Sequence, residues 1–259
     1  MRMHLLDCGM MDIPYSNILH NEESKPGMFI SVPVEAFLIE HREGLILFDT
    51  GCDPNGIAGN WPEEYRKIPY RGKHLPERLQ ALGIKFDDIM YVIASHLHFD
   101  HAGCLSLFRK ARIFVSETEL KSTLHAYQNQ LDLNAHLKSD IKSWIQADLQ
   151  WERVSFAEVR LADGITIINF GPGHSWGMLG LKVELPVSGN YFLVADAIYT
   201  RKNQGPPQKL LGLLHDREGY QKTVALIESY ASENHATIIY GHDPDQFQSL
   251  LKRANGWLE

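Results

Sequence analysis

The sequence predicts an α/β fold built from short buried strands and amphipathic helices, joined by hairpins as well as crossovers. Apolar, β-rich runs recur between turn signals and predict strands at residues 34–39, 45–48, 91–94, 113–115, 165–170, 179–185, 191–195 and 237–240. Patterns of helical period lie between them, several opening with proline or acidic residues, and predict helices at residues 76–82, 117–125, 137–148, 218–232 and 244–254. Residues 15–33 and 201–216 show neither pattern, so we expect long loops there that form walls of a pocket.

Two of the predicted strands end in an aspartate and resemble each other. Residues 45–51 read LILFDTG and residues 191–197 read YFLVADA, so the strand-end residues are Asp49 and Asp196. The likeness suggests an internal duplication and therefore two stacked sheets. A chain of 259 residues is within the size range of one domain, so we expect a single domain over residues 1–259.

The composition argues against several kinds of partner. The net charge is −7, whereas nucleic-acid binders normally carry clustered basic residues, so we expect no nucleic-acid partner. No apolar run approaches the roughly 18 residues that span a bilayer, so we expect no membrane partner.

The N-terminus has no apolar stretch followed by a cleavage site, which makes the cytoplasm the expected location. Cys8, Cys52 and Cys104 are few and scattered, which predicts reduced thiols in or near the core.

The chemistry is concentrated in residues 94–103, which read ASHLHFDHAG and directly follow an apolar strand. In extended backbone, residues two apart point the same way, so His96 and His98 can converge on one cation. If the chain then turns, Asp100 and His101 face a second position close by. We expect Gly103 to supply conformational freedom where the backbone turns. Neutral imidazole and carboxylate are ligands that suit Zn²⁺ and related divalent ions, so this run predicts a metal site.

Further candidate ligands lie downstream. His174 is in the run GPGHSWG at residues 171–177, Asp196 ends a strand, and His242 is in the run IYGHDP at residues 239–244. Taken singly, each histidine is more typical of a hydrogen-bonded loop residue and Asp196 of a helix N-cap. Their joint presence after the first motif, each following a strand or a tight turn, favours membership of the same metal site.

The complete pattern resembles the metallo-β-lactamase superfamily. This resemblance implies a four-layer αββα sandwich, in which two stacked mixed sheets are flanked by helices and the metal site lies on loops at one edge. It also implies that one metal is held by His96, His98 and His174, the other by Asp100, His101 and His242, and that Asp196 bridges both. Asp49 is similar to the strand-end aspartate of the family, and either orients a ligand imidazole or caps a turn.

A pair of divalent cations predicts a hydrolase. Two such ions about 3.5–4 Å apart lower the pKa of shared water enough for a bridging hydroxide to act as nucleophile at neutral pH. The same ions polarise a carbonyl and stabilise the oxyanion that forms. Esters, thioesters, lactones, lactams and phosphodiesters are therefore the candidate substrates. Zn²⁺ is the default metal, although Mn²⁺, Fe²⁺ and Co²⁺ accept the same ligands.

Within the superfamily, the sequence is most similar to the N-acyl-homoserine lactonases, the quorum-quenching branch. The likeness comprises the amino-acid sequence of residues 95–103, the Asp-x-x-Tyr element at residues 196–199 and the strand pair at residues 34–51. It implies that Tyr199 hydrogen-bonds the lactone carbonyl or its oxyanion, and that Asp100 delivers a proton to the departing alkoxide. An alternative for Tyr199 is an aromatic ring packed beneath the site. Candidates to line an acyl-chain groove, or else to be buried, are Phe99, Met11, Ile13 and Phe29.

Two departures leave the substrate open. Cys104 stands where lactonases often have a second glycine, and the run WGMLG at residues 176–180 differs from the commoner wording. Another small-molecule lactonase or esterase, similar to pyridoxolactonase, therefore remains an alternative. A thioester hydrolase is less favoured, because it would normally need a helical extension after His242 and little chain follows that residue. A diiron oxygen reductase is less favoured, because it would typically have a carboxylate in place of His98. A metal-binding module without turnover is the non-enzymatic alternative, and the long loops are equally suited to a homodimer contact.

Overall fold

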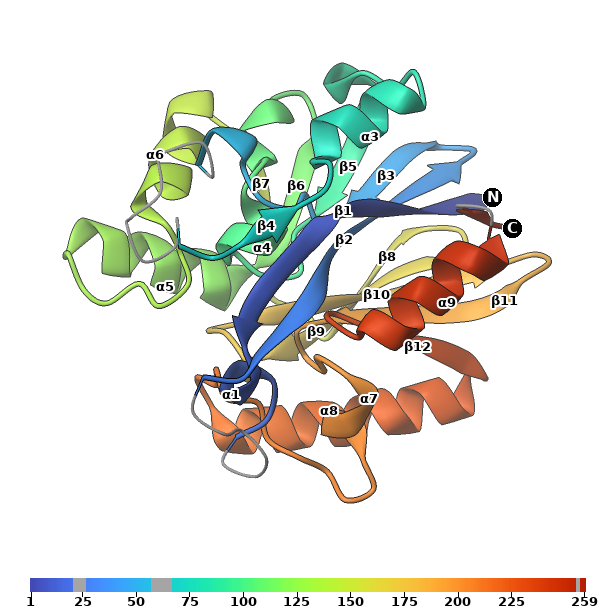
Figure 1. Cartoon of the computed structure of the whole chain (residues 1–259). Coiled ribbons are helices and arrows are strands. Elements are labelled where there is room, and N and C mark those ends of the chain that lie inside the picture. Colours follow the sequence, from blue (N-terminus) through green and yellow to red (C-terminus); the bar gives the residue numbers. More distant parts are fainter. Residues whose placement is uncertain (21–26, 57–66, 255–256) are drawn as a thin grey trace.

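The computed structural model describes residues 1–20, 27–56, 67–254 and 257–259, and it places two stacked sheets between helices (Figure 1). The first sheet has the order β13-β1-β2-β3-β5-β6-β7, with β4 paired to β1. Its strands are β1 (Arg2–Pro14), β2 (Phe29–His41), β3 (Gly44–Phe48), β4 (Tyr70–Arg71), β5 (Ile89–Ile93), β6 (Arg112–Ser116), β7 (Gln150–Val154) and β13 (Trp257–Leu258). Pairing is antiparallel from β1 to β3 and parallel from β3 to β7, so the sheet is mixed.

The second sheet is also mixed and has the order β12-β11-β10-β9-β8. Its strands are β8 (Glu158–Ala162), β9 (Ile165–Gly171), β10 (Met178–Leu185), β11 (Gly189–Ala195) and β12 (Ala236–Tyr240). Only the pairing of β11 with β12 is parallel among these described strands. The two sheets with their flanking helices confirm the predicted αββα sandwich.

Both faces of the central strands are buried, which explains why they appear in the sequence as nearly continuous apolar runs. In β2, Phe37 and Ile39 belong to the core between the sheets, together with Leu181 and Leu193 of the second sheet. Leu38, between them in the chain, belongs to the core on the opposite face, beneath the helices. Alternate residues of one strand thus stabilise two different layers.

Helices flank the two sheets, most of them on the outer faces, whereas the helix at residues 244–254 packs Phe247 and Leu250 into the core between the sheets. They are α1 (Tyr15–Ile18), α3 (Leu75–Ala81), α4 (Phe99–Ala102), α5 (Glu117–Gln128), α6 (Lys138–Ala147), α7 (Arg201–Gln204), α8 (Arg217–Glu233) and α9 (Pro244–Ala254). In α8, Tyr220, Val224 and Ile227 recur at helical spacing and are buried. Asp216 caps this helix by accepting a hydrogen bond from the Glu218 amide at 3.0 Å. No helix in the described part of the chain is long and apolar enough to cross a membrane.

Some expectations about local structure were wrong. Residues 15–33 are not one loop, because α1 begins at Tyr15 and β2 at Phe29, while residues 21–26 lie outside the described residues. The apolar pattern also missed β1, β7 and β8. These strands mix polar with apolar residues, and in β1 the register against β2 shifts between Asp7 and Met10. Such strands form because a neighbouring strand supplies hydrogen-bond partners, which a local pattern does not reveal.

Candidate metal centre

The predicted ligands meet at one edge of the sandwich, where strands of both sheets end. His96 and His98 follow β5, and Asp100 and His101 lie in the short helix α4 that comes next. The remaining ligands are His174 between β9 and β10, Asp196 directly after β11, and His242 after β12. All of these residues are buried, with at most 7% of their surface exposed.

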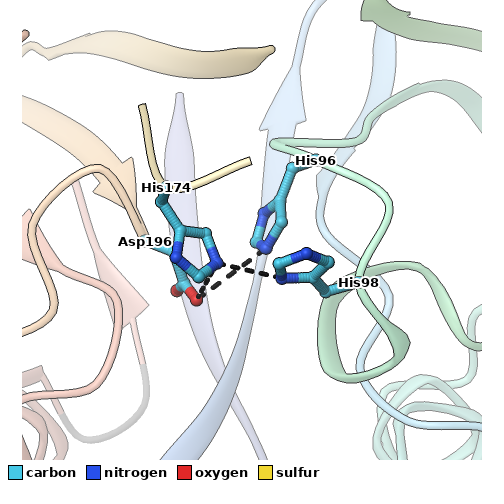
Figure 2. A group of neighbouring side chains, drawn as sticks. All are labelled: His96, His98, His174 and Asp196. Atoms are coloured by element: carbon cyan, nitrogen blue, oxygen red, sulfur yellow. Dashed lines mark hydrogen bonds and ion pairs between the residues drawn. The ribbon is translucent and has the colours of Figure 1, made fainter. Parts of the chain in front are cut away.

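The ligand atoms form two groups. His96, His98, His174 and Asp196 offer atoms that lie within 4.8 Å of one another (Figure 2), and a second group consists of Asp100, His101 and His242. In the first group, Nδ1 of His98 lies 2.9 Å from Nε2 of His174. In the second, Oδ2 of Asp100 lies 3.4 Å from Nε2 of His242.

Asp196 faces both groups, one oxygen to each. Its Oδ2 lies 3.3 Å from Nε2 of His174 and 3.8 Å from Nε2 of His96. Its Oδ1 lies 3.1 Å from Nε2 of His101 and 3.2 Å from Nε2 of His242. A carboxylate placed in this way suits a bridge between two cations.

The outer nitrogens of the rings are already engaged, which directs the inner nitrogens to the centre. Nδ1 of His101 lies 2.8 Å from Oδ2 of Asp49, and Nδ1 of His174 lies 2.9 Å from the Leu213 carbonyl oxygen. Nδ1 of His242 lies 2.9 Å from the Pro33 carbonyl oxygen. With the proton on Nδ1, each ring turns a free lone pair on Nε2 inward, as metal-ligating histidines normally do.

Buried polar atoms that make no hydrogen bond in the described chain indicate that these residues fit divalent cations. Nε2 of His96, Nε2 of His101 and Oδ1 of Asp196 are buried and accept or donate no hydrogen bond within the described chain. Burial lowers the pKa of His96 and of His98 well below the ordinary value, which keeps both rings neutral and able to ligate. Buried carboxylates without counter-charge are costly, and cations at the centre would supply that charge.

The carboxylates of Asp196 and Asp100 also change the protonation of a histidine in the second group. Burial alone would lower the pKa of His242, but the negative charges of Asp196 and Asp100 outweigh it and raise this pKa to about 10. The two carboxylates therefore create a strongly favourable position for positive charge. In the absence of a metal, a proton on the ring takes that position.

Asp49 orients ligands from the end of β3. Its backbone is left-handed, with φ 59°. The carboxylate accepts hydrogen bonds from the Ser95 amide at 2.7 Å, from Ser95 Oγ at 2.8 Å and from Nδ1 of His101. Ser95 Oγ in turn lies 3.0 Å from Nδ1 of His96. Of the two roles expected for Asp49, the geometry shows the orientation of an imidazole.

Tyr199 lies between the two groups. It is buried, its hydroxyl lies 3.4 Å from Nδ1 of His174, and its ring packs edge-on against both His174 and His242. Burial, followed by the negative charges of Asp196 and Asp100, raises the pKa of Tyr199 well above its ordinary value. Its hydroxyl therefore stays protonated and able to donate.

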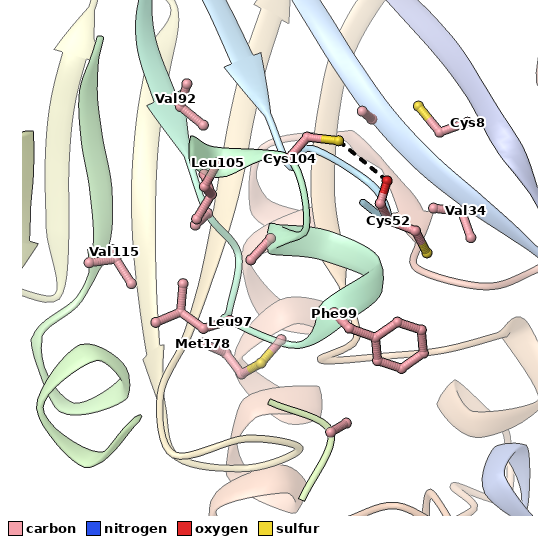
Figure 3. Packing of buried hydrophobic residues seen from close by; sticks show 14 of the residues in the cluster. Cys8, Val34, Cys52, Val92, Leu97, Phe99, Cys104, Leu105, Val115 and Met178 are labelled. Atoms are coloured by element: carbon pink, nitrogen blue, oxygen red, sulfur yellow. Dashed lines mark hydrogen bonds between the residues drawn. The ribbon is translucent and has the colours of Figure 1, made fainter. Parts of the chain in front are cut away.

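Residues proposed for a groove have other surroundings. Phe99, Met11 and Ile13 are buried in the hydrophobic core, whereas Phe29 is 61% exposed. Figure 3 shows Phe99 and the cysteines in this core. The cysteines are free and buried, with Cys104 Sγ 3.3 Å from the Cys52 carbonyl oxygen, which confirms reduced thiols in the core.

Gly103 is needed for space and not for conformational freedom, contrary to expectation. Its φ is −59°, within the right-handed helical region open to every residue. A Cβ at this position would lie 2.3 Å from the Asp53 amide nitrogen. The α4 helix can therefore approach the turn after β3 closely only with glycine here.

Two buried polar residues near the centre were not anticipated. Glu119, in the first turn of α5, and His136, just before α6, hydrogen-bond each other beside His98. In the sequence, Glu119 is an ordinary acidic residue of a helix start. No local signal distinguishes it, because its partners come from distant segments.

The comparisons with known proteins identify the family. The profile of the metallo-beta-lactamase superfamily matches residues 31–242. The chain belongs to this superfamily. It is 38% identical to the N-acyl homoserine lactonase AiiB of Agrobacterium fabrum, with 100% of this chain and 99% of the relative covered. It is 30% identical to the N-acyl homoserine lactonase AttM of Azorhizobium caulinodans, with 100% and 98% covered.

Solved structures agree with this assignment. An N-acyl homoserine lactone hydrolase with the product N-hexanoyl-L-homoserine bound at its catalytic metal centre has a TM-score of 0.81 at 26% identity, covering 96% of this chain and 95% of that one. A Bacillus thuringiensis AiiA variant with N-decanoyl-L-homoserine bound at its active site has a TM-score of 0.81 at 25% identity, with the same coverage.

Proposed function

We propose that this protein is a dinuclear metal-dependent hydrolase that opens the ring of N-acyl-homoserine lactones. The observation that carries the proposal is Asp196, whose two oxygens face two separate groups of ligand atoms. The full-length similarity to lactonases supports the substrate class. His96, His98 and His174 would hold one cation, Asp100, His101 and His242 the other, and Asp196 both.

Two bound divalent cations supply Lewis acidity, lowering the pKa of water at the site and favouring negative charge on a carbonyl oxygen. We assign Zn²⁺ to both positions, because three imidazoles with one carboxylate at the first, and two imidazoles with two carboxylates at the second, are nitrogen and oxygen ligand sets that suit zinc. Asp49 and the Leu213 and Pro33 carbonyls keep the ligand rings in one tautomer, so the lone pairs are oriented before substrate arrives.

The chain's own groups complete the reaction. Tyr199, kept protonated, donates a hydrogen bond to the lactone carbonyl oxygen as negative charge develops on it. Asp100 takes the proton that the attacking water loses and passes it to the ring oxygen as the ester bond breaks. That oxygen would otherwise leave as an alkoxide, a poor leaving group. The product is the open-chain hydroxy acid, which at neutral pH ionises to its carboxylate and releases one proton.

The space for substrate adjoins the first group of ligands. A hollow of about 40 Å³ is lined by His98, His174 and Trp176, and Trp176 also lines a second hollow of about 510 Å³ beside α5. Trp176 belongs to residues 176–180, where the sequence differs from the motif that is common in lactonases. The preferred acyl group must therefore be measured with a panel of substrates.

The test is metal analysis combined with turnover. Protein loaded with Zn²⁺ is assayed by proton release and mass spectrometry on short- and long-chain N-acyl-homoserine lactones, γ-butyrolactone, a thioester and a β-lactam. We expect two metal ions per chain and ring opening of the acylated lactones. Two bound ions with no lactone opened would refute the substrate class, and a single bound ion would refute the dinuclear centre.

A further inference from the structure

Glu119 is a buried carboxylate that the reaction described above does not use. Its side chain is completely buried although it lies in the first turn of α5. Four donors surround it. Oε1 accepts from the Leu97 amide at 2.9 Å and from Nε2 of His136 at 2.8 Å. Oε2 accepts from the Gly177 amide at 2.9 Å, and Ser175 Oγ lies 2.8 Å from both oxygens.

Three of these donors, those of Leu97, Ser175 and Gly177, belong to the two loops that carry the histidines of the first group. Leu97 lies between His96 and His98 in the chain, and residues 175–177 directly follow His174. The two loops are far apart in sequence, and Nδ1 of His98 and Nε2 of His174 nevertheless lie 2.9 Å apart. One carboxylate therefore ties together the backbones on both sides of this pair of nitrogens.

His136 extends the same network to the ligand ring itself. Its Nδ1 lies 2.8 Å from the Leu133 carbonyl oxygen, so both ring nitrogens face oxygen acceptors. The ring packs edge-on against His98, with centroids 4.6 Å apart, and stacks on Trp176 at 4.5 Å. Burial opposes the charge on Glu119, but His136, the Leu97 amide and Ser175 outweigh burial and lower the pKa of Glu119.

We propose that Glu119 is a positioning residue of the metal centre, which sets the separation of His98 and His174 and thereby the affinity of the site formed by His96, His98 and His174. It complements Asp49, which orients His101 in the other group. The inference rests on the proposed dinuclear centre. Its role is positional because no atom of Glu119 is assigned to a metal or to substrate.

Glu119→Gln isolates this role with almost no change in volume. A glutamine has one acceptor oxygen and one NH₂ donor, whereas the Leu97 amide approaches one carboxylate oxygen and the Gly177 amide the other. In either orientation, one backbone N–H faces the NH₂ group and loses its hydrogen bond. Either the loop of His98 or the loop of His174 is then released.

The experiment measures metal affinity by competition with a chromophoric chelator, together with the visible spectrum of the Co²⁺-loaded protein. We expect Glu119→Gln to bind one of the two ions roughly 10–100-fold more weakly and to show an altered Co²⁺ spectrum. With saturating metal, kcat should fall by a larger factor than the factor by which KM rises. Ser175→Ala leaves the hydrogen bonds from the Leu97 and Gly177 amides in place, so it should lower metal affinity less, by roughly 2–10-fold.

Asp140→Asn is the matched control. Asp140 also has a buried carboxyl group, but it accepts from Ser139 Oγ, and its Oδ2 has no hydrogen-bond partner in the described chain. This variant should keep parental metal affinity. Parental affinity and spectrum in folded Glu119→Gln, or an equal loss in Asp140→Asn, would overturn the inference.

Two further results are decisive. If Glu119→Gln does not fold, Ser175→Ala serves in its place, and unchanged affinity in that folded variant also overturns the inference. If the parent protein itself binds fewer than two ions, the proposed function fails and not the positioning role alone. The metal readout does not depend on which lactone is turned over.

Discussion

Asp49→Asn should weaken metal binding through the tautomer of a single histidine. In the parent protein, Oδ1 of Asp49 accepts from the Ser95 amide, and Oδ2 accepts from Ser95 Oγ and from Nδ1 of His101, all within 2.8 Å. An asparagine that keeps its oxygen toward the Ser95 amide presents NH₂ to His101. Nδ1 must then accept, so the proton moves to Nε2 and the lone pair that faces Asp196 is lost.

The other orientation of the asparagine is no better, because its NH₂ then faces the Ser95 amide, which cannot change its proton. Loss of an outer hydrogen bond of this kind typically lowers metal affinity about 10–100-fold, equivalent to roughly 1.4–2.8 kcal/mol. We expect this loss for the ion held by Asp100, His101 and His242. The side-chain volume is unchanged, so the fold should persist.

Chelator competition on folded Asp49→Asn measures the effect, with circular dichroism to verify folding and Asp140→Asn as the control buried carboxylate. The reasoning is refuted if Asp49→Asn holds two ions as tightly as the parent. It is also refuted if both variants lose metal equally, since the effect would then follow from the replacement of any buried carboxyl group.

Further predictions concern separate parts of the molecule. Asp196→Asn should lose metal and turnover together, because the amide NH₂ cannot ligate; full metal content by elemental analysis would contradict the bridging role. Tyr199→Phe should retain both ions and lower kcat by about 10²–10³-fold, the usual cost of one oxyanion donor, and parental kcat would exclude that role. Gly103→Ala should lower the free energy of unfolding by roughly 1–3 kcal/mol through contact with the Asp53 amide; an unchanged melting temperature would show that α4 can shift. Burial raises the pKa of Asp140 to about 8, so the folded state binds more protons than the unfolded state between the ordinary carboxyl pKa and pH 8. Stability should therefore fall as pH rises through this window, and Asp140→Asn should remove the slope and add roughly 1–4 kcal/mol near pH 7; denaturant unfolding with the same pH slope in both proteins would contradict this.

The local sequence was sufficient to predict the strands that are buried on both faces and the helices with an apolar stripe. Burial on both faces requires continuous apolar runs, and these are visible without knowledge of the neighbours. The edge strands β7 and β8 and the long strand β1 were missed. Their backbone hydrogen bonds depend on a partner strand, and their side chains are partly polar because one face or one end is exposed.

For the metal centre, the sequence alone determined which side chains are brought together. Imidazole and carboxylate in a run such as residues 94–103 have few other uses, and the order of the later ligands restricts the family. Only the tertiary structure decided how those side chains are held. The Pro33 and Leu213 carbonyls, Asp49 and Glu119 act through hydrogen bonds between segments that are distant in the chain. Such contacts leave no local pattern, because a backbone carbonyl or a helix-start glutamate is chemically ordinary until folding places it beside a ligand.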